Sequence, residues 1–385
     1  MGTLLQSFYT ERITKIKKIK VGYTKSRMEK DIKVNLSILD IEDKYTYDYD
    51  ETVYGSDNIV SYGKDNNAPI LYKNCYQNSA TLKSVIDGSV NYILGEEVVV
   101  NDEGALFKER VNRSGMTMKE LVAKLALSNQ IYGGFAIQVI FNKLGVPIEL
   151  YPLEFSRCRL NEKGTKVFYS KKNWTKWGTK SDVYDVFNME NIDPKKRTQI
   201  LYVKGDFTNN VYPLPQWFGA LRDVLVEIEC SKYALNSVSN GFSARYLINI
   251  PDGAGMDNEQ KQAIEDAIKA KFCGSEVDAN FMLYYADGEG YVDIKKIESD
   301  DANERYINIK DNARSNIYTA MRCTPNLMGL PTATTGFNSQ EYSSAFKLYQ
   351  KSVIQGIQDH IVKALNKVIG KGAVSIVPFQ IRFEE

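Results

Sequence analysis

Two long helical patterns that meet at an uncharged connection limit the folds open to this chain. Apolar side chains recur at helical spacing over residues 302–321 and again over 339–369. The second pattern, at about 1.5 Å per residue, spans roughly 45 Å. Asn338 and Glu341, at its start, have the spacing of a capping box. Residues 325–340 contain no charged side chain, so we expect a polar loop at the meeting point of two rods.

The composition is that of a folded protein with more than one packed region. Its 385 residues exceed what one hydrophobic core usually organises, and 43% of them are hydrophobic. The 49 basic and 48 acidic side chains nearly cancel, which argues against a protein that wraps nucleic acid through a globally positive surface. Any contact with nucleic acid is expected to be local or loose.

Charge is unevenly distributed only near the start of the chain. Residues 1–30 are rich in lysine, whereas residues 31–57 are rich in aspartate and glutamate. Two interpretations stay open: an arm that pairs with a neighbour or with itself, and a partly disordered, solvated tail.

Cysteine spacing and hydropathy indicate a chain made and kept in the cytoplasm. The five cysteines are too far apart for a Cys-x-x-Cys pair and suit a reducing compartment, at positions Cys75, Cys158, Cys230, Cys273 and Cys323. No signal peptide follows Met1. No apolar run approaches the roughly 20 residues of a membrane span, so we expect no membrane partner.

The first half of the chain predicts an α+β region that ends near residue 210. Helical spacing covers residues 80–94, which stop at Gly95, and residues 117–132, which stop at Gly133. A short strand is expected at 98–100. After the second helix the period changes to two, which predicts strands at 135–141, 148–153, 158–160, 166–169, 183–187 and 199–203.

A small α/β insertion is predicted between two long helices. Apolar spacing indicates one amphipathic helix over 217–242, and residues 302–321 form the other. Between them we expect a helix over 258–272, where Asp257 and Gln260 have capping-box spacing. The expected strands of the insertion lie at 248–250, 281–285 and 292–294.

The residues that could support catalysis are few, and we expect no enzyme activity, no cofactor and no metal site. His360 is the only histidine and lies in a helical pattern, where packing or a surface position is favoured. A thiol dyad of Cys323 with His360 has no local signature. The glycines at 288–290 and 329–336 lack the Gly-Lys-Ser/Thr ending of a phosphate loop. A magnesium site of the nuclease type lacks a clear acidic cluster.

Basic and aromatic residues alternate at 171–177, which include Trp174 and Trp177. This composition can stack bases and hold phosphates, but a hairpin tip with a solvated rim is favoured. Because tryptophan is enriched at interface centres, Trp174, Trp177 and Trp217 are candidates for contacts between subunits.

Several segments together resemble one known family in their order along the chain. They lie at residues 62–69, 95, 129–140, 151–159, 212–221, 240–242, 256–274 and 317–329. In this order the chain resembles the portal proteins of tailed bacteriophages, in the shorter branch typical of phages with long non-contractile tails. The likeness covers roughly residues 60–370, and no single motif is diagnostic.

The resemblance implies an α+β, portal-like subunit of seven regions. These are an N-terminal arm (1–58), an α+β wing (59–216), a first stem helix (217–246), a clip (247–298), a second stem helix (299–324), a tunnel loop (325–338), and a crown helix with a C-terminal strand (339–385). It also implies a homo-oligomeric ring, normally of twelve subunits, at one capsid vertex of the virion, assembled in the host cytoplasm. Double-stranded DNA would pass through this ring during packaging and ejection.

The resemblance also implies partners and site residues. The clip would dock the large subunit of the terminase motor and later the head-to-tail adaptor, and the ring would meet the major capsid and scaffold proteins. The tunnel loop would line the DNA with Thr332, Thr334, Thr335, Phe337 and Asn338. The clip's docking residues would be Asp257, Lys261, Glu265, Lys269 and Lys271.

Two other functions stay open at this point. One is a non-portal connector or capsid component, and the other is a DNA-binding protein or nuclease that uses the basic and aromatic segment at 171–177. An uncharged loop favours the channel, because lysine or arginine at a narrow point would hold the phosphates of passing DNA.

Overall fold

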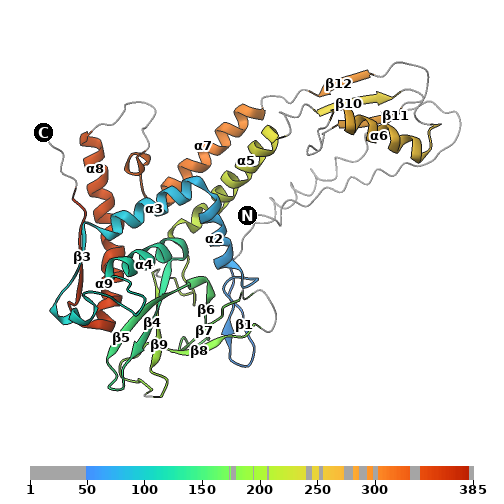
Figure 1. The fold of residues 1–385 in the computed structure, drawn as a ribbon. Coiled ribbons are helices and arrows are strands. Elements are labelled where there is room, and N and C mark those ends of the chain that lie inside the picture. Colours follow the sequence, from blue (N-terminus) through green and yellow to red (C-terminus); the bar gives the residue numbers. More distant parts are fainter. Residues whose placement is uncertain are drawn as a thin grey trace, which may run out of the picture. The chain divides into compact units, whose positions relative to one another are not determined.

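The computed structural model describes residues 49–172, 174, 179–193, 195–205, 208–239, 245–250, 255–272, 281–285, 293–297, 302–329 and 339–380. All of these belong to the second of two compact units, Tyr47–Glu385. Blocks of helices and strands follow one another along the chain, and this mixture of helices and sheets fits the α+β class that the sequence predicts (Figure 1).

A six-stranded sheet forms the largest β structure. Its strands are β4 (Gly134–Phe141), β5 (Pro147–Leu153), β6 (Cys158–Leu160), β7 (Lys166–Tyr169), β8 (Asp182–Val186) and β9 (Thr198–Lys204). The order is β5-β4-β9-β8-β7-β6, and only the β8–β9 pair is parallel. All six predicted strands are confirmed to within one residue at each end, because their alternating apolar residues are a local signal.

Three helices precede or flank this sheet. They are α2 (Ala68–Asn78), α3 (Ala80–Leu94) and α4 (Met118–Tyr132), and α4 packs on β4 and β5 (Figure 1). Thr117 and Glu120 form a capping box at the start of α4, and Gly133, at φ 80°, ends it. The sequence did not predict α2, although Pro69 stands in its first turn, where proline is favoured.

Two long helices flank a smaller sheet in sequence. After the 3-10 turn η4 (Gln216–Ala220), α5 (Leu221–Ser239) packs along α7 (Ala302–Ala320) (Figure 1). The amide of Asn316 on α7 donates to Asp223 Oδ1 on α5 at 2.8 Å. The predicted helix at 302–321 is confirmed, and the one at 217–242 begins as a 3-10 turn.

The insertion between these helices forms a three-stranded sheet with one helix. Strand β10 (Arg245–Ile250) lies between β11 (Phe281–Tyr285), which is parallel to it, and β12 (Asp293–Ile297), which is antiparallel. The connecting helix is α6 (Asn258–Phe272). Its predicted capping box is confirmed, because Gln260 N donates to Asp257 Oδ1 at 2.8 Å and Asp257 N to Gln260 Oε1 at 3.2 Å.

The last part of the chain returns to the first helices. After the 3-10 turn η6 (Pro325–Met328), the helices α8 (Ser339–Tyr349) and α9 (Gln355–Ile369) are joined by the π-helical segment η7 (Gln350–Ile354). The predicted long helix is therefore confirmed with one π-helical turn, which no sequence pattern indicated. Asn338, its expected cap, lies outside the described residues.

Two short antiparallel pairs complete the fold. Strand β13 (Val374–Val377) pairs with β3 (Glu97–Val100), and β1 (Val53–Tyr54) pairs with β2 (Ile59–Val60). The C-terminal strand expected within 339–385 is therefore β13. The β1–β2 hairpin was not predicted, since two residues per strand leave no periodicity to read. Across the described part of the chain, no helix is both long and apolar enough to span a bilayer.

Gly133 and Gly115 provide a matched test of the connection from α4 into β4. Both have positive φ, but a Cβ on Gly133 would lie 2.5 Å from the carbonyl oxygen of Leu214, whereas one on Gly115 would meet nothing within 4 Å. Gly115→Ala should lower the free energy of unfolding by about 1 kcal/mol through backbone strain alone. Gly133→Ala should lower it by about 3 kcal/mol, because the Leu214 backbone must also move.

Urea denaturation of the two variants, followed by circular dichroism, measures this difference. Equal destabilisation by the two substitutions would show that the close approach of Leu214 to Gly133 contributes nothing.

Candidate functional site

The segments that carry the family resemblance converge on one buried tyrosine. The Tyr62 ring is fully buried and stacks on Tyr212, with ring centroids 4.2 Å apart and planes 9° from parallel. Its hydroxyl donates to the carbonyl oxygen of Pro213 at 2.7 Å. The Tyr212 hydroxyl in turn donates to the Val60 carbonyl oxygen at 2.6 Å. Tyr62 therefore joins the entry segment at 62–69 to the segment that leads into α5.

Arg159 is a buried cation held without a carboxylate partner among the described residues. Its side chain is 1% exposed. Its Nε donates to Asn66 Oδ1, and its terminal nitrogens donate to three backbone carbonyl oxygens, those of Asn66 at 2.9 Å, Ser156 at 2.9 Å and Cys158 at 2.7 Å. The guanidinium carbon lies 5.6 Å from the centre of the Tyr62 ring and 5.5 Å from that of Trp174.

This environment replaces the water around the Arg159 charge with carbonyl dipoles and aromatic faces. Burial lowers the pKa of the guanidinium below its ordinary value, although arginine stays charged at neutral pH. The Trp174 indole is fixed as well, because its Nε1 donates to the Arg157 carbonyl oxygen at 2.8 Å. Through the hydrogen bonds from Arg159 to Asn66, the 62–69 segment is bound to strand β6, which carries Arg159.

Trp217 anchors the start of the α5 region in the same core. It is fully buried, and its Nε1 donates to the Gln130 carbonyl oxygen near the end of α4 at 3.1 Å. Its ring packs edge-to-face with Tyr72 on α2, with ring centroids 5.6 Å apart. The core thus holds η4 against two helices of the larger α+β region.

A buried carboxylate makes a second link between α5 and that region. Glu227 on α5 is 2% exposed and accepts hydrogen bonds at the N-terminus of α3. The donors are the Ser79 hydroxyl, the Thr81 hydroxyl at 2.6 Å and the Thr81 backbone N–H at 3.3 Å. A helix N-terminus favours a negative charge because its N–H groups and dipole point toward it. Glu227 therefore fixes α5 to α3.

Tyr92 on α3 contacts the start of the uncharged segment and the helix α8 that follows it. The Tyr92 hydroxyl donates to the Leu327 carbonyl oxygen in η6 at 2.8 Å and lies 3.2 Å from the Tyr342 hydroxyl on α8. Burial and the neighbouring Tyr342 hydroxyl raise the pKa of Tyr92 above its ordinary value, so the phenol stays protonated. Gly329, at φ 77°, ends η6. The base of the loop is thus fixed to one helix.

His360 and the buried cysteines have packing roles. The ring centroids of His360 and Phe135 lie 5.9 Å apart in an edge-to-face arrangement. Burial, and to a smaller extent the nearby Lys363 ammonium, lowers the pKa of His360, so the ring is neutral at pH 7. Burial raises the pKa of Cys323 to about 12. No hydrogen bond joins Cys323 to His360 in the described structure, and no group of three acidic, cysteine or histidine residues there could hold a metal ion.

Two of the three tryptophans expected at subunit contacts, Trp174 and Trp217, pack inside this chain instead. Trp217 is fully buried and Trp174 is 9% exposed, so both rings are already occupied inside this chain. An aromatic side chain suits an interface and a core equally, so the sequence could not decide between the two. Only the fold shows where these rings pack. Trp177 lies outside the described residues, as does Lys176 of the basic segment.

The expected loop and clip residues are only partly described. Thr332, Thr334, Thr335, Phe337 and Asn338 lie outside the described residues. On α6, Asp257 is the cap, and Lys261 and Glu265 follow one and two turns later. Lys269 and Lys271 belong to the last turns of α6. The Lys261 ammonium lies 5.3 Å from the centre of the Tyr285 ring.

Sequence reasoning missed two anchoring residues, Glu227 and Tyr92. Glu227 had a usable signal, because it comes three residues after Val224 on the apolar face of a helix, where an acid requires a buried partner. Tyr92 had none, since a tyrosine at the edge of a helical apolar pattern is ordinary.

Exchanging Arg159 for lysine tests the buried cation. A lysine retains the charge but lacks the planar fork that reaches four acceptors, so Arg159→Lys should lower the free energy of unfolding by about 3 kcal/mol. The neighbouring Arg157→Lys, at a half-exposed side chain, should change it by no more than about 0.5 kcal/mol. Thermal denaturation of both variants measures the contrast, and a stable Arg159→Lys protein would contradict this role.

Thiol labelling tests the conclusion about Cys323. Its pKa is raised, so at pH 8 the folded protein holds it as the unreactive thiol. We expect iodoacetamide at pH 8 to modify Cys323 only after unfolding in urea, as read by mass spectrometry of its peptide. Rapid modification in the folded protein would instead indicate an activated thiolate.

Comparisons with known proteins concern the sequence family and the fold. A family model described as "Phage portal protein" matches residues 85–383. The fold is similar to a chain in the virion of a native gene transfer agent particle, at TM-score 0.53 and 17% identity over 84% of this chain and 86% of that one. It is also similar to a chain in the neck of an empty particle of this kind, computed with C6 symmetry, at TM-score 0.53 and 18% identity over 81% and 84%.

A third similar structure is an HK97 family phage portal protein from Corynebacterium diphtheriae. The TM-score is 0.52 and the identity 12%, over 80% of this chain and 94% of that one. No curated protein matches the sequence. At these identities the structures support the fold alone, whereas the family model covers most of the chain.

Proposed function

The chain belongs to the phage portal protein family, and we propose that copies of it form the ring through which double-stranded DNA enters and leaves a tailed-phage capsid. Members of this family are structural channel proteins rather than enzymes. One chain of similar fold belongs to the neck of an empty gene transfer agent particle that was computed with C6 symmetry. Closed rotational symmetry of this kind supports a ring, and twelve subunits is a copy number that sixfold symmetry allows.

The observation that carries the proposal is an uncharged loop with a fixed base. Residues 325–340 carry no charge, and Tyr92 contacts both Leu327, near the start of this segment, and Tyr342 on the helix that follows it. In a ring, this arrangement would present one polar loop per subunit to a common axis. DNA affinity comes mostly from lysine and arginine contacts to phosphates, so a loop without them lets a duplex slide.

We assign the remaining regions from the same premise. Residues 59–216 would be the wing, and the paired helices in 217–246 and 299–324 would be the stem. The links through Trp217 and Glu227 support this assignment, because they would pass force between stem and wing without a flexible joint. Residues 1–58 would be an arm, and 339–385 the crown helix with its C-terminal strand.

Residues 247–298 would be the clip that docks the terminase large subunit and later the head-to-tail adaptor. The exposed acids and amides on α6 support a polar docking surface, since Glu259, Gln262 and Asp266 all face solvent. The major capsid and scaffold proteins would surround the ring at one vertex of the virion, after assembly in the host cytoplasm.

A lysine in the tunnel loop tests the channel. Thr334→Lys would place one ammonium per subunit against the duplex, and a ring of lysines that contacts even a few phosphates holds DNA strongly. In a packaging-competent phage system, we expect intact rings but at least about a tenfold loss of nuclease-protected DNA per particle. Thr334→Ser, the matched control, should package normally. Normal packaging by the lysine variant would contradict a loop that lines the DNA.

A further inference from the structure

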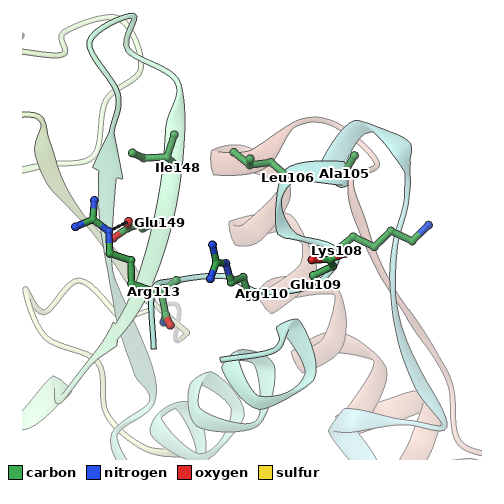
Figure 2. A pocket seen from close by; sticks show the side chains of 9 residues that line it. Ala105, Leu106, Lys108, Glu109, Arg110, Arg113, Ile148 and Glu149 are labelled. Carbon is green, nitrogen blue, oxygen red and sulfur yellow. Dashed lines mark ion pairs between the residues drawn. The ribbon is translucent and has the colours of Figure 1, made fainter. Parts of the chain in front are cut away.

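A small groove separates the segment after β3 from the edge of the six-stranded sheet. One wall is the 3-10 turn η2 (Asp102–Phe107) with the residues that follow it, and the other is β5. The groove has a volume of about 430 Å³ and is lined by Ala105, Leu106, Lys108, Glu109, Arg110, Asn112, Arg113, Ile148 and Glu149 (Figure 2). This volume is in the range of sites that hold a short peptide segment or a small molecule.

Two cations in the groove lining, Lys108 and Arg110, have no acidic partner in the described part of the chain, and only Arg110 points toward the gap (Figure 2). Arg113 is paired with the largely buried Glu149 at 2.7 Å, and Glu149 also accepts from the Tyr151 hydroxyl at 3.0 Å. Arg110 makes neither an ion pair nor a hydrogen bond with any described residue. Figure 2 shows its guanidinium pointing toward the gap between Leu106 and Ile148. The groove therefore offers one free arginine fork.

Each wall of this mostly polar groove carries one large apolar side chain near Arg110, Leu106 on one side and Ile148 on the other. Leu106 is 60% exposed, which is unusual for a leucine beside a folded sheet, and it faces Ile148 across the gap (Figure 2). A ligand that fills the gap would cover both side chains, and burial of apolar surface favours such contact.

The groove also runs along the edge of a sheet. β5 is the outermost strand, and only β4 pairs with it among the described strands. Further along, this edge is covered, because Leu150 N donates to the Val111 carbonyl oxygen at 2.8 Å and the Asn112 amide donates to the Leu150 carbonyl oxygen at 2.9 Å. The coverage stops next to Ile148, where the groove opens. Sheet edges recognise extended peptides.

We propose that this groove binds an extended peptide segment of another protein, one that carries a single carboxylate beside an apolar side chain. The carboxylate would pair with the Arg110 fork, which suits its planar, two-oxygen geometry. The apolar side chain would lie between Leu106 and Ile148. Glu109 in the lining disfavours a run of acids, so the chemistry selects one carboxylate rather than a polyanion. None of the lining residues belongs to the proposed tunnel loop (325–338) or clip (247–298).

Peptide binding to the full-length protein tests the proposal. The probe is an array of octapeptides in which one aspartate is flanked by leucine, valine or phenylalanine, with a matched array that has asparagine in place of aspartate. We expect binding of aspartate peptides, measured in solution by fluorescence anisotropy, and at least about tenfold weaker binding of the asparagine forms, as the loss of a charged hydrogen bond requires.

Variants assign the binding to the groove. Arg110→Glu should weaken the aspartate peptide at least about tenfold through loss and reversal of the charge, and Leu106→Asn should weaken it without reducing the preference for aspartate. Lys163→Glu, an exposed cation in the β6–β7 turn, should leave binding unchanged. Arg110 and Leu106 are exposed, so both variants should fold with the melting temperature of the parent protein.

Three results would overturn the proposal. They are the absence of binding by every aspartate peptide, equal binding of the aspartate and asparagine forms, and undiminished binding to Arg110→Glu. A change in oligomer mass on Arg110→Glu, read by mass photometry, without peptide binding by the parent would make the groove a contact between copies of this chain instead.

Discussion

The burial of Arg159 is the constraint on which the rest of this structure depends. A guanidinium taken out of water must find several acceptors or it destabilises the fold by several kcal/mol. Here Asn66 and backbone carbonyl oxygens supply them, while Tyr62 and Trp174 cover the charge. The entry segment at 62–69 therefore cannot leave strand β6 without exposing an unsatisfied cation. The aromatic cluster around Tyr62 forms on this fixed base.

Further buried contacts connect this aromatic cluster to the long helices. Tyr212 stacks on Tyr62 just before the chain turns into η4, and Trp217 then binds the end of α4. Glu227 on α5 makes a second link to the larger α+β region, at the N-terminus of α3. The same helix α3 carries Tyr92, which holds the base of the uncharged loop. The sheet, the long helices and the start of the loop are thus joined through directional contacts that are buried or partly buried.

The sequence predicted what is local and missed what is long-range. Strands of the larger sheet and the helices at 80–94 and 302–321 follow from periodicity and caps, which act within a few residues. Trp217 was expected at a subunit contact because an aromatic residue suits a core and an interface equally. Its position is decided by Gln130, 87 residues earlier. Likewise the resemblance singled out the segments of Tyr62 and Arg159, but their contact lies beyond any local pattern.

Electron microscopy of the purified full-length protein tests the central claim most directly, because it reads the assembly without a motor, a capsid or DNA. The account predicts annular particles with a central hole and rotational symmetry. In such a ring, the loops of all subunits would face one shared axis. Compact monomers or dimers alone, at high protein concentration and with scaffold protein present, would contradict it.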